Sequence, residues 1–138
     1  MKIKRNRVIK CNLNNPTKKI SQREKIKKII YQIWLKKNKD EQIPSNVISN
    51  IEMARTWCKN NGYEHVLIDE NSNVYKECIN TSNFCKYHLR NNTKYKACIL
   101  SDYIRLYVIH KFGGIYIDCD VTILHGFDLF LYNDFFIN

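Results

Sequence analysis

The sequence predicts a single α/β domain with a mostly parallel sheet and flanking helices. Short β-branched runs alternate with longer segments whose apolar residues recur every three or four positions, giving the order strand, helix, strand, helix, strand. Of the 138 residues, 44% are hydrophobic and 26% are charged, which is typical of a folded globular chain and excludes disorder of the whole. A chain of this length suits one domain.

The first half of the chain supplies two strands and the helix between them. Residues 29–35 are short, β-branched and aromatic, as in a buried strand. Ser45 is a suitable N-cap for a helix over residues 45–60, and Gly62 is a suitable stop. A second strand is expected over residues 63–68. The apolar face of the helix comprises Val47, Ile48, Ile51, Ala54, Trp57 and Cys58.

The second half supplies further helices and a third strand. Residues 72–92 are polar with scattered aromatics and predict short helices. Residues 94–112 predict a helix by their apolar period, and Gly113-Gly114 ends it. The third strand, residues 115–117, runs directly into Asp118-Cys119-Asp120.

The formal net charge of +10 lies entirely in the first 28 residues, which hold eleven basic residues and one acidic residue. The other 110 residues hold twelve of each sign. A neutral body argues against an extended nucleic-acid interface, so no nucleic-acid partner is expected. We interpret residues 1–27 as a basic leader, either a solvated tail or, through residues 1–28, a peripheral contact with an anionic membrane.

The location expected from the sequence is cytoplasmic, either free or peripheral at the inner face of the membrane. No stretch approaches the roughly 18 consecutive apolar residues of a membrane helix, and no apolar segment follows the N-terminal charges as in a signal peptide. Reduced thiols are therefore expected rather than disulfides. The cysteines are Cys11, Cys58, Cys78, Cys85, Cys98 and Cys119.

Two carboxylates, Asp118 and Asp120, stand where the third strand ends. At this spacing both can turn toward one hard cation, and Mg²⁺ and Mn²⁺ prefer such oxygen ligands, with substrate phosphates completing the shell. A D-x-D pair alone is common and usually solvated. Trp34, at the end of the first strand, is expected at the same edge of the sheet, where such folds bind ligands.

Asp102 and Arg105 are charged residues three positions apart on the predicted helix 94–112. One interpretation is a surface or half-buried ion pair. The other is a functional face, on which Arg105 contacts a diphosphate or sugar and Asp102 accepts hydrogen bonds from hydroxyls.

Two blocks of the chain resemble the DXD-containing glycosyltransferases. Ser101-Asp102-Tyr103-Ile104-Arg105, followed by Lys111 to Asp120, is similar to their S-D-x-x-R…G-G-i-Y-x-D-x-D block. The K-I-I-Y-Q-I-W run ending at Trp34 is similar to their first strand, with Tyr31 in place of histidine. These enzymes include capsular-polysaccharide and mannosyltransferase-like enzymes and, more distantly, the glucosyltransferase domains of clostridial toxins. The resemblance implies the nucleotide-diphospho-sugar transferase fold called GT-A.

The resemblance also implies roles for six residues. Asp102, Arg105, Asp118 and Asp120 form the implied catalytic set, and Trp34 and Tyr116 border the donor nucleotide. Asp102 and Arg105 contact the donor sugar and diphosphate, while Asp118 reaches the ribose or sugar. Asp120, together with Asp118, holds Mn²⁺ or Mg²⁺. The implied reaction retains the anomeric configuration of the sugar.

The leading hypothesis is therefore transfer of a sugar from a metal-bound nucleotide-diphosphate sugar to a glycan, polysaccharide or lipid-linked saccharide, as in capsule biosynthesis. One alternative is a toxin-like protein glycosyltransferase. Another is a non-catalytic remnant whose basic leader binds membrane or nucleic acid. Family members continue further, so we expect residues 28–138 to be the N-terminal, nucleotide-sugar-binding part of a domain truncated at its C-terminus, within the apolar run 127–137.

Overall fold

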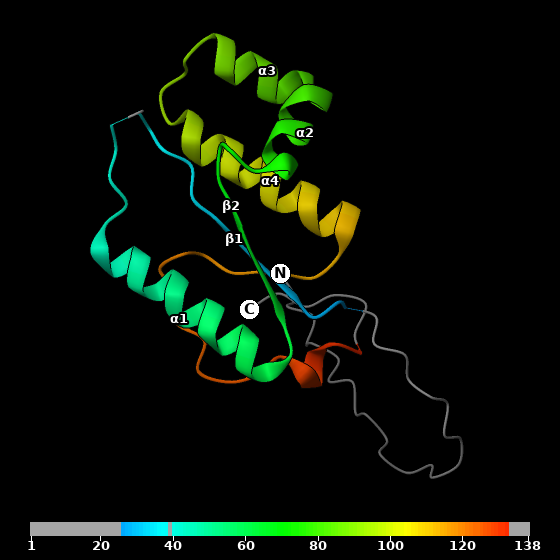
Figure 1. Ribbon diagram of the computed structural model, residues 1–138. Coiled ribbons are helices and arrows are strands. Elements are labelled where there is room, and N and C mark those ends of the chain that lie inside the picture. The colour runs from blue at the N-terminus through cyan, green and yellow to red at the C-terminus, as the bar shows by residue number, and fades with distance from the viewer. Residues whose placement is uncertain (1–25, 39, 133–138) are drawn as a thin grey trace, which may run out of the picture.

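The computed structural model describes residues 26–38 and 40–132 and has the predicted α/β architecture (Figure 1). The predicted order of strands and helices is confirmed, with two short helices in the polar region 72–92. The elements are β1 (Ile29–Ile33), α1 (Ser45–Asn61), β2 (Glu64–Ile68), α2 (Asn73–Thr81), α3 (Asn83–Arg90), α4 (Lys96–Phe112), β3 (Ile115–Tyr116) and a 3₁₀ turn, η1 (Asp128–Phe130).

The sheet has three parallel strands in the order β2-β1-β3, with β1 in the centre. Tyr31 of β1 lies opposite Val66 on one side and Tyr116 on the other. The pairing continues past β3, because the backbone N–H of Ile117 donates to the carbonyl of Tyr31 at 3.0 Å. The carboxyl ends of all three strands therefore meet at one edge of the sheet.

Helices cover the two faces of the sheet separately: α1 lies on one face and α4, with α2 and α3, on the other (Figure 1). Successive side chains of β1 point to opposite faces, so Ile30 shares a buried cluster with residues of α1, whereas Tyr31 shares one with residues of α4. The strand order explains this arrangement. The first connection runs from β1 to β2, and the second runs back in the opposite direction from β2 past β1 to β3, so right-handed crossovers place their helices on opposite faces.

Helix α1 differs from the prediction at its start and on its face. Ser45 is the first helical residue and not the cap, because Pro44 occupies the cap position and no side chain caps the helix. Ile48 is 47% exposed and lies off the buried stripe, since α1 covers the sheet with a narrow stripe only. The end is as predicted, at Gly62 with φ 71° and ψ 29°. The buried residues of the helix are Val47, Ile51, Ala54 and Cys58.

The described C-terminal part returns to the start of β1. The backbone N–H of Ile26 donates to the carbonyl of Leu131 at 2.9 Å, and the Leu131 side chain is fully buried. The ammonium of Lys28 lies 2.9 Å from a carboxylate oxygen of Asp128. The rest of the predicted apolar run, residues 133–138, and residues 1–25 of the basic leader lie outside the described residues.

Four of the five described cysteines, Cys58, Cys78, Cys85 and Cys119, are buried, Cys98 is exposed, and all five are free thiols. Among the described residues, no helix combines the length and the apolar character needed to cross a membrane.

Gly114 allows β3 to start close to β1. Its φ is +103°, a conformation that side chains with a Cβ rarely adopt. A Cβ at this position would lie 2.8 Å from the carbonyl oxygen of Ile29 and 2.9 Å from Cε2 of the buried Tyr31 ring. Both backbone conformation and space therefore require glycine here.

We predict that Gly114→Ala lowers the free energy of unfolding by about 3 kcal/mol, because strain at a positive φ adds to a steric clash with β1. The control is Gly62→Ala, which also has a positive φ, +71°, but no atom within 4 Å of the added Cβ. That control should lose only about 1 kcal/mol. Urea denaturation of both variants measures the difference, and equal losses would contradict the steric argument.

Candidate active site

The predicted site residues lie where the order of the strands reverses. The chain passes from β1 to β2 on one side and then to β3 on the other side of β1. In sheets of this kind, ligands bind outside the carboxyl ends of the strands at such a point. Trp34 directly follows β1, and Asp118 follows β3 after one residue, so both flank this position.

The turn that carries the two carboxylates, residues 118–121, is attached to β1. The Asp118 carbonyl accepts hydrogen bonds from the backbone N–H of Val121 at 3.2 Å and from Nε2 of Gln32 at 3.3 Å. The thiol of Cys119 donates to the carbonyl of Ile33 at 3.3 Å. We call residues 118–121 the DxD turn.

Within the DxD turn, Asp118 and Asp120 are exposed while Cys119 is only 6% exposed. Cys119 is therefore a packing residue of the turn. Burial raises the pKa of its thiol to about 11, so the sulfur stays protonated at neutral pH.

A continuous chain of contacts links α4 to the DxD turn. Arg105 forms an ion pair with Asp102, one turn earlier on the helix. The guanidinium carbon of Arg105 lies 5.0 Å from the centroid of the Tyr116 ring, a cation–π contact. The Tyr116 hydroxyl donates to Oδ1 of Asp118 at 2.6 Å. The structure therefore brings four of the six predicted residues together, with the side chains of Asp102 and Arg105 62% and 37% exposed.

Trp34 lies beside the DxD turn on the α1 side. Its backbone N–H donates to the carbonyl of Ile68 at 3.0 Å, which holds the residue next to β2. Its partly exposed indole packs against the buried cluster of Val47, Ile51 and Cys119. The indole Nε1 is buried without a hydrogen-bond partner among the described residues, a position that costs about 1–3 kcal/mol.

The residues at the carboxyl edge fit a hard divalent cation bound together with a ligand. The described residues contain no group of three or more His, Cys, Asp or Glu side chains that could hold a metal alone. The DxD turn offers two exposed carboxylates, and Mg²⁺ or Mn²⁺ commonly takes only one or two carboxylates with water and substrate phosphates. Asp102 pairs with Arg105, whereas the exposed carboxylates of Asp118 and Asp120 are the pair available to a cation.

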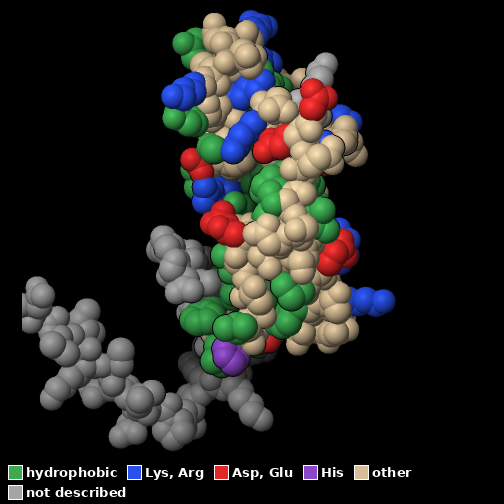
Figure 2. All heavy atoms as spheres, turned by 90° about the vertical axis from the view of Figure 1, so that its left-hand side faces the viewer, with side chains coloured by type: hydrophobic (Ala, Val, Ile, Leu, Met, Phe, Trp, Pro, Cys, Tyr) green, Lys and Arg blue, Asp and Glu red, His purple; other side chains and the backbone are tan. Residues whose placement is uncertain are grey.

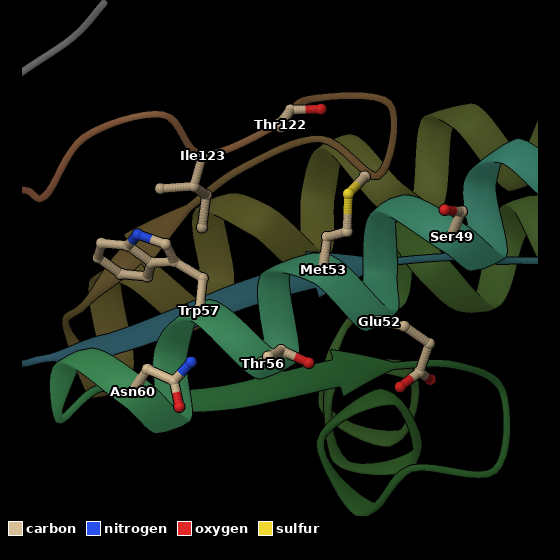
Figure 3. A pocket seen from close by; sticks show the side chains of 8 residues that line it. All are labelled: Ser49, Glu52, Met53, Thr56, Trp57, Asn60, Thr122 and Ile123. Atoms are coloured by element: carbon tan, nitrogen blue, oxygen red, sulfur yellow. The ribbon is translucent and has the colours of Figure 1, made fainter.

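A separate hollow of about 510 Å³ lies along α1, between the helix and the segment after the DxD turn (Figure 3). None of the six predicted residues lines it. In Figure 3, Trp57 and Ile123 lie toward one end of the hollow, and Met53 lies further along α1, on the side of Thr122. The lining residues are Ser49, Glu52, Met53, Thr56, Trp57, Asn60, Thr122 and Ile123. Figure 2 shows acidic and basic side chains interspersed on this side of the molecule, as expected of a neutral body.

Two residues behind the DxD turn were not predicted from the sequence. Gln32 contacts the turn, and His65 contacts Gln32. Gln32 is fully buried, and its Oε1 lies 2.9 Å from Nε2 of His65. The only available signal was an amide inside an otherwise apolar strand. His65 matches no ligand spacing, and its position beside Gln32 depends on the pairing of β1 with β2.

Comparison with known proteins gives one family. The profile of the glycosyltransferase sugar-binding region containing a DXD motif matches residues 24–136, which is most of the chain. No curated protein and no solved structure gives a significant match.

We predict that Tyr116 contributes to stability in a pH-dependent way. Burial, and then the hydrogen bond to Asp118, raise the pKa of Tyr116 above its ordinary value of 10.0. The folded phenol therefore keeps its proton where the unfolded one ionises, so the stabilisation is complete below pH 10 and is lost as the pH rises toward the folded pKa. In Tyr116→Phe, the fall in the free energy of unfolding above pH 10 should be shallower by up to about 1.4 kcal/mol per pH unit. Urea denaturation between pH 9 and 11 measures this slope, and identical slopes would contradict the prediction.

Proposed function

Because the chain belongs to the family of glycosyltransferase sugar-binding regions that contain a DXD motif, we propose that it binds a nucleotide-diphosphate sugar with Mn²⁺ or Mg²⁺ and transfers the sugar with retention of its anomeric configuration. The acceptor is a glycan, a polysaccharide or a lipid-linked saccharide. The chain of contacts from Asp102 through Arg105 and Tyr116 to Asp118 supports this proposal, because it links a guanidinium suited to phosphate oxygens, through the Tyr116 ring, to a carboxylate suited to a cation.

The donor is bound between the ends of β1 and β3. Arg105 donates to the diphosphate oxygens, which its planar guanidinium matches with two parallel hydrogen bonds. The guanidinium lies over the ring of Tyr116, which leaves its edge for these hydrogen bonds. Trp34 offers a partly exposed aromatic surface for the nucleotide base, and Asp102 accepts hydrogen bonds from sugar hydroxyls.

In the transfer, the bond from the anomeric carbon to the diphosphate oxygen breaks, a bond to an acceptor hydroxyl oxygen forms, and the hydroxyl proton passes to the departing diphosphate. Negative charge develops on the departing diphosphate, and the guanidinium of Arg105 stabilises it. Asp118 and Asp120 would hold the divalent cation, which would supply Lewis-acid stabilisation of the same charge. Asp102 orients the sugar, so that the anomeric carbon faces the acceptor.

The first test is Asp118→Asn and Asp120→Asn in the full chain. Each substitution should reduce Mn²⁺-dependent hydrolysis or transfer of the donor sugar by about 100-fold or more, because it weakens the cation site that stabilises the leaving group. The control is Asp128→Asn, the same chemical change in η1, where Asp128 pairs with Lys28 before β1. Asp128→Asn should keep the wild-type activity. In a separate measurement on the wild-type product, NMR of the anomeric proton shows whether the configuration is retained. Wild-type rates in both site variants would refute the proposal.

The second test concerns the guanidinium. Arg105→Lys keeps the charge but loses the planar fork, so the donor dissociation constant should rise about tenfold, corresponding to about 1.4 kcal/mol. The control is Lys111→Ala, a cation of the same helix that pairs with Glu77 instead. Calorimetry with uridine and guanosine diphosphate sugars in the presence of Mn²⁺ compares the two variants. Donor affinity that is unchanged in Arg105→Lys would remove Arg105 from the donor site.

A further inference from the structure

Gln32 is a buried amide in the middle of the central strand. Tyrosines aside, Gln32 and Ser82 are the buried polar residues in the described part of the chain. Ser82 has an evident structural task, since its hydroxyl accepts from the backbone N–H of Cys85 and caps α3. Gln32 performs no such task in β1, where an apolar side chain would suit the core. A buried amide without partners costs about 1–3 kcal/mol, so the partners of Gln32 must account for it.

The two partners of Gln32 determine how its amide is oriented. The Asp118 carbonyl, 3.3 Å from Nε2, can only accept, so the NH₂ group must face it. Oε1 therefore faces His65, whose Nε2 lies 2.9 Å away and must donate. His65 thus carries a proton on Nε2. Burial lowers its pKa, and the charge of Arg55 lowers it further while Glu52 raises it, so a neutral ring makes this hydrogen bond.

The contact acts on the first peptide of the DxD turn, which directly follows Asp118. The Asp118 carbonyl belongs to the peptide that joins Asp118 to Cys119, and it also accepts from Val121, which closes the DxD turn. Gln32 therefore attaches the start of the turn to β1 across 86 residues of sequence. The thiol of Cys119, the next residue of the turn, donates to the carbonyl of Ile33 and so attaches the turn to β1 a second time.

We propose that Gln32 is a positioning residue that holds the DxD turn in its cation-binding conformation, and that His65 orients its amide. The consequence for the cation rests on the proposed function, whereas the consequence for the order of the turn does not. Metal ligands need to be held within about 0.5 Å of their working positions, and a turn attached only by its own backbone does not provide this.

Amide hydrogen exchange tests the order of the turn directly. Gln32→Leu removes both hydrogen bonds at similar volume, and Gln32→Glu keeps the shape but replaces the donor with an acceptor. Both variants should speed exchange at Val121 at least about tenfold, with exchange in α4 unchanged. Ser82→Ala, the other buried polar position, controls for general loss of stability and should leave Val121 unaffected. Wild-type exchange at Val121, or equal acceleration in α4, would overturn the proposal.

A second set of variants tests the role of His65. His65→Leu should speed exchange at Val121 less than Gln32→Leu, because the amide remains but is no longer oriented. The double variant should match Gln32→Leu alone, since His65 acts only through Gln32. Additive effects of the two substitutions would show that His65 supports the turn by another route and would refute its assigned part.

Mn²⁺ binding, followed by the EPR signal of the free ion in the presence of a nucleoside diphosphate, tests the consequence for the site. The dissociation constant of Mn²⁺ should rise about tenfold in Gln32→Leu and remain near the wild-type value in Ser82→Ala. Equal affinity in Gln32→Leu and wild type would refute positioning even where exchange is faster. A wild-type chain that binds no Mn²⁺ would refute the proposed function, and the exchange result would still decide the role of Gln32.

Discussion

The attachment of β3 and the DxD turn to the central strand holds the candidate site together. β3 has only two residues, so its own ladder is short. The pairing is extended by the hydrogen bonds from Ile117 to Tyr31, from Gln32 to Asp118 and from Cys119 to Ile33. Gly114 makes this approach possible, because any side chain there would meet β1. Tyr116, Asp118 and Asp120 take their places from this contact.

The site receives its parts from both faces of the sheet. On the α4 face, Arg105 contacts the Tyr116 ring, and the Tyr116 hydroxyl donates to the carboxylate of Asp118. On the α1 face, Trp34 packs against the cluster that contains Cys119. The DxD turn lies between these two layers at the edge of the sheet. A parallel sheet with helices on both faces is therefore well suited to assembling such a site, since its strand ends are accessible from either layer.

The ion pair on α4 shows how a surface interaction can serve a site without contributing much to stability. Exposed pairs such as Asp102 and Arg105 are typically worth about 0–1 kcal/mol. The main consequence of the pair is the position of the guanidinium, because the pair and the Tyr116 ring together restrict it to one end of the sheet. The same logic applies to Gln32, whose hydrogen bonds fix an orientation more than they add free energy.

The sequence alone determined the order of the elements and placed Trp34 and Asp118 at the carboxyl side of the first and third strands, although these strands end at Ile33 and Tyr116, earlier than predicted. Apolar period, β-branching and glycine stops act between residues a few positions apart, so a linear pattern contains them. The prediction that Ser45 caps α1 was wrong, because Ser45 is already the first helical residue and Pro44 occupies the cap position. Only the tertiary structure decided that β1 is central, that Tyr116 reaches Asp118 and Arg105, and that Gln32 meets His65 and the DxD turn. The link from Gln32 to the turn joins residues 86 positions apart, and their meeting depends on strand pairing and packing that no local pattern specifies.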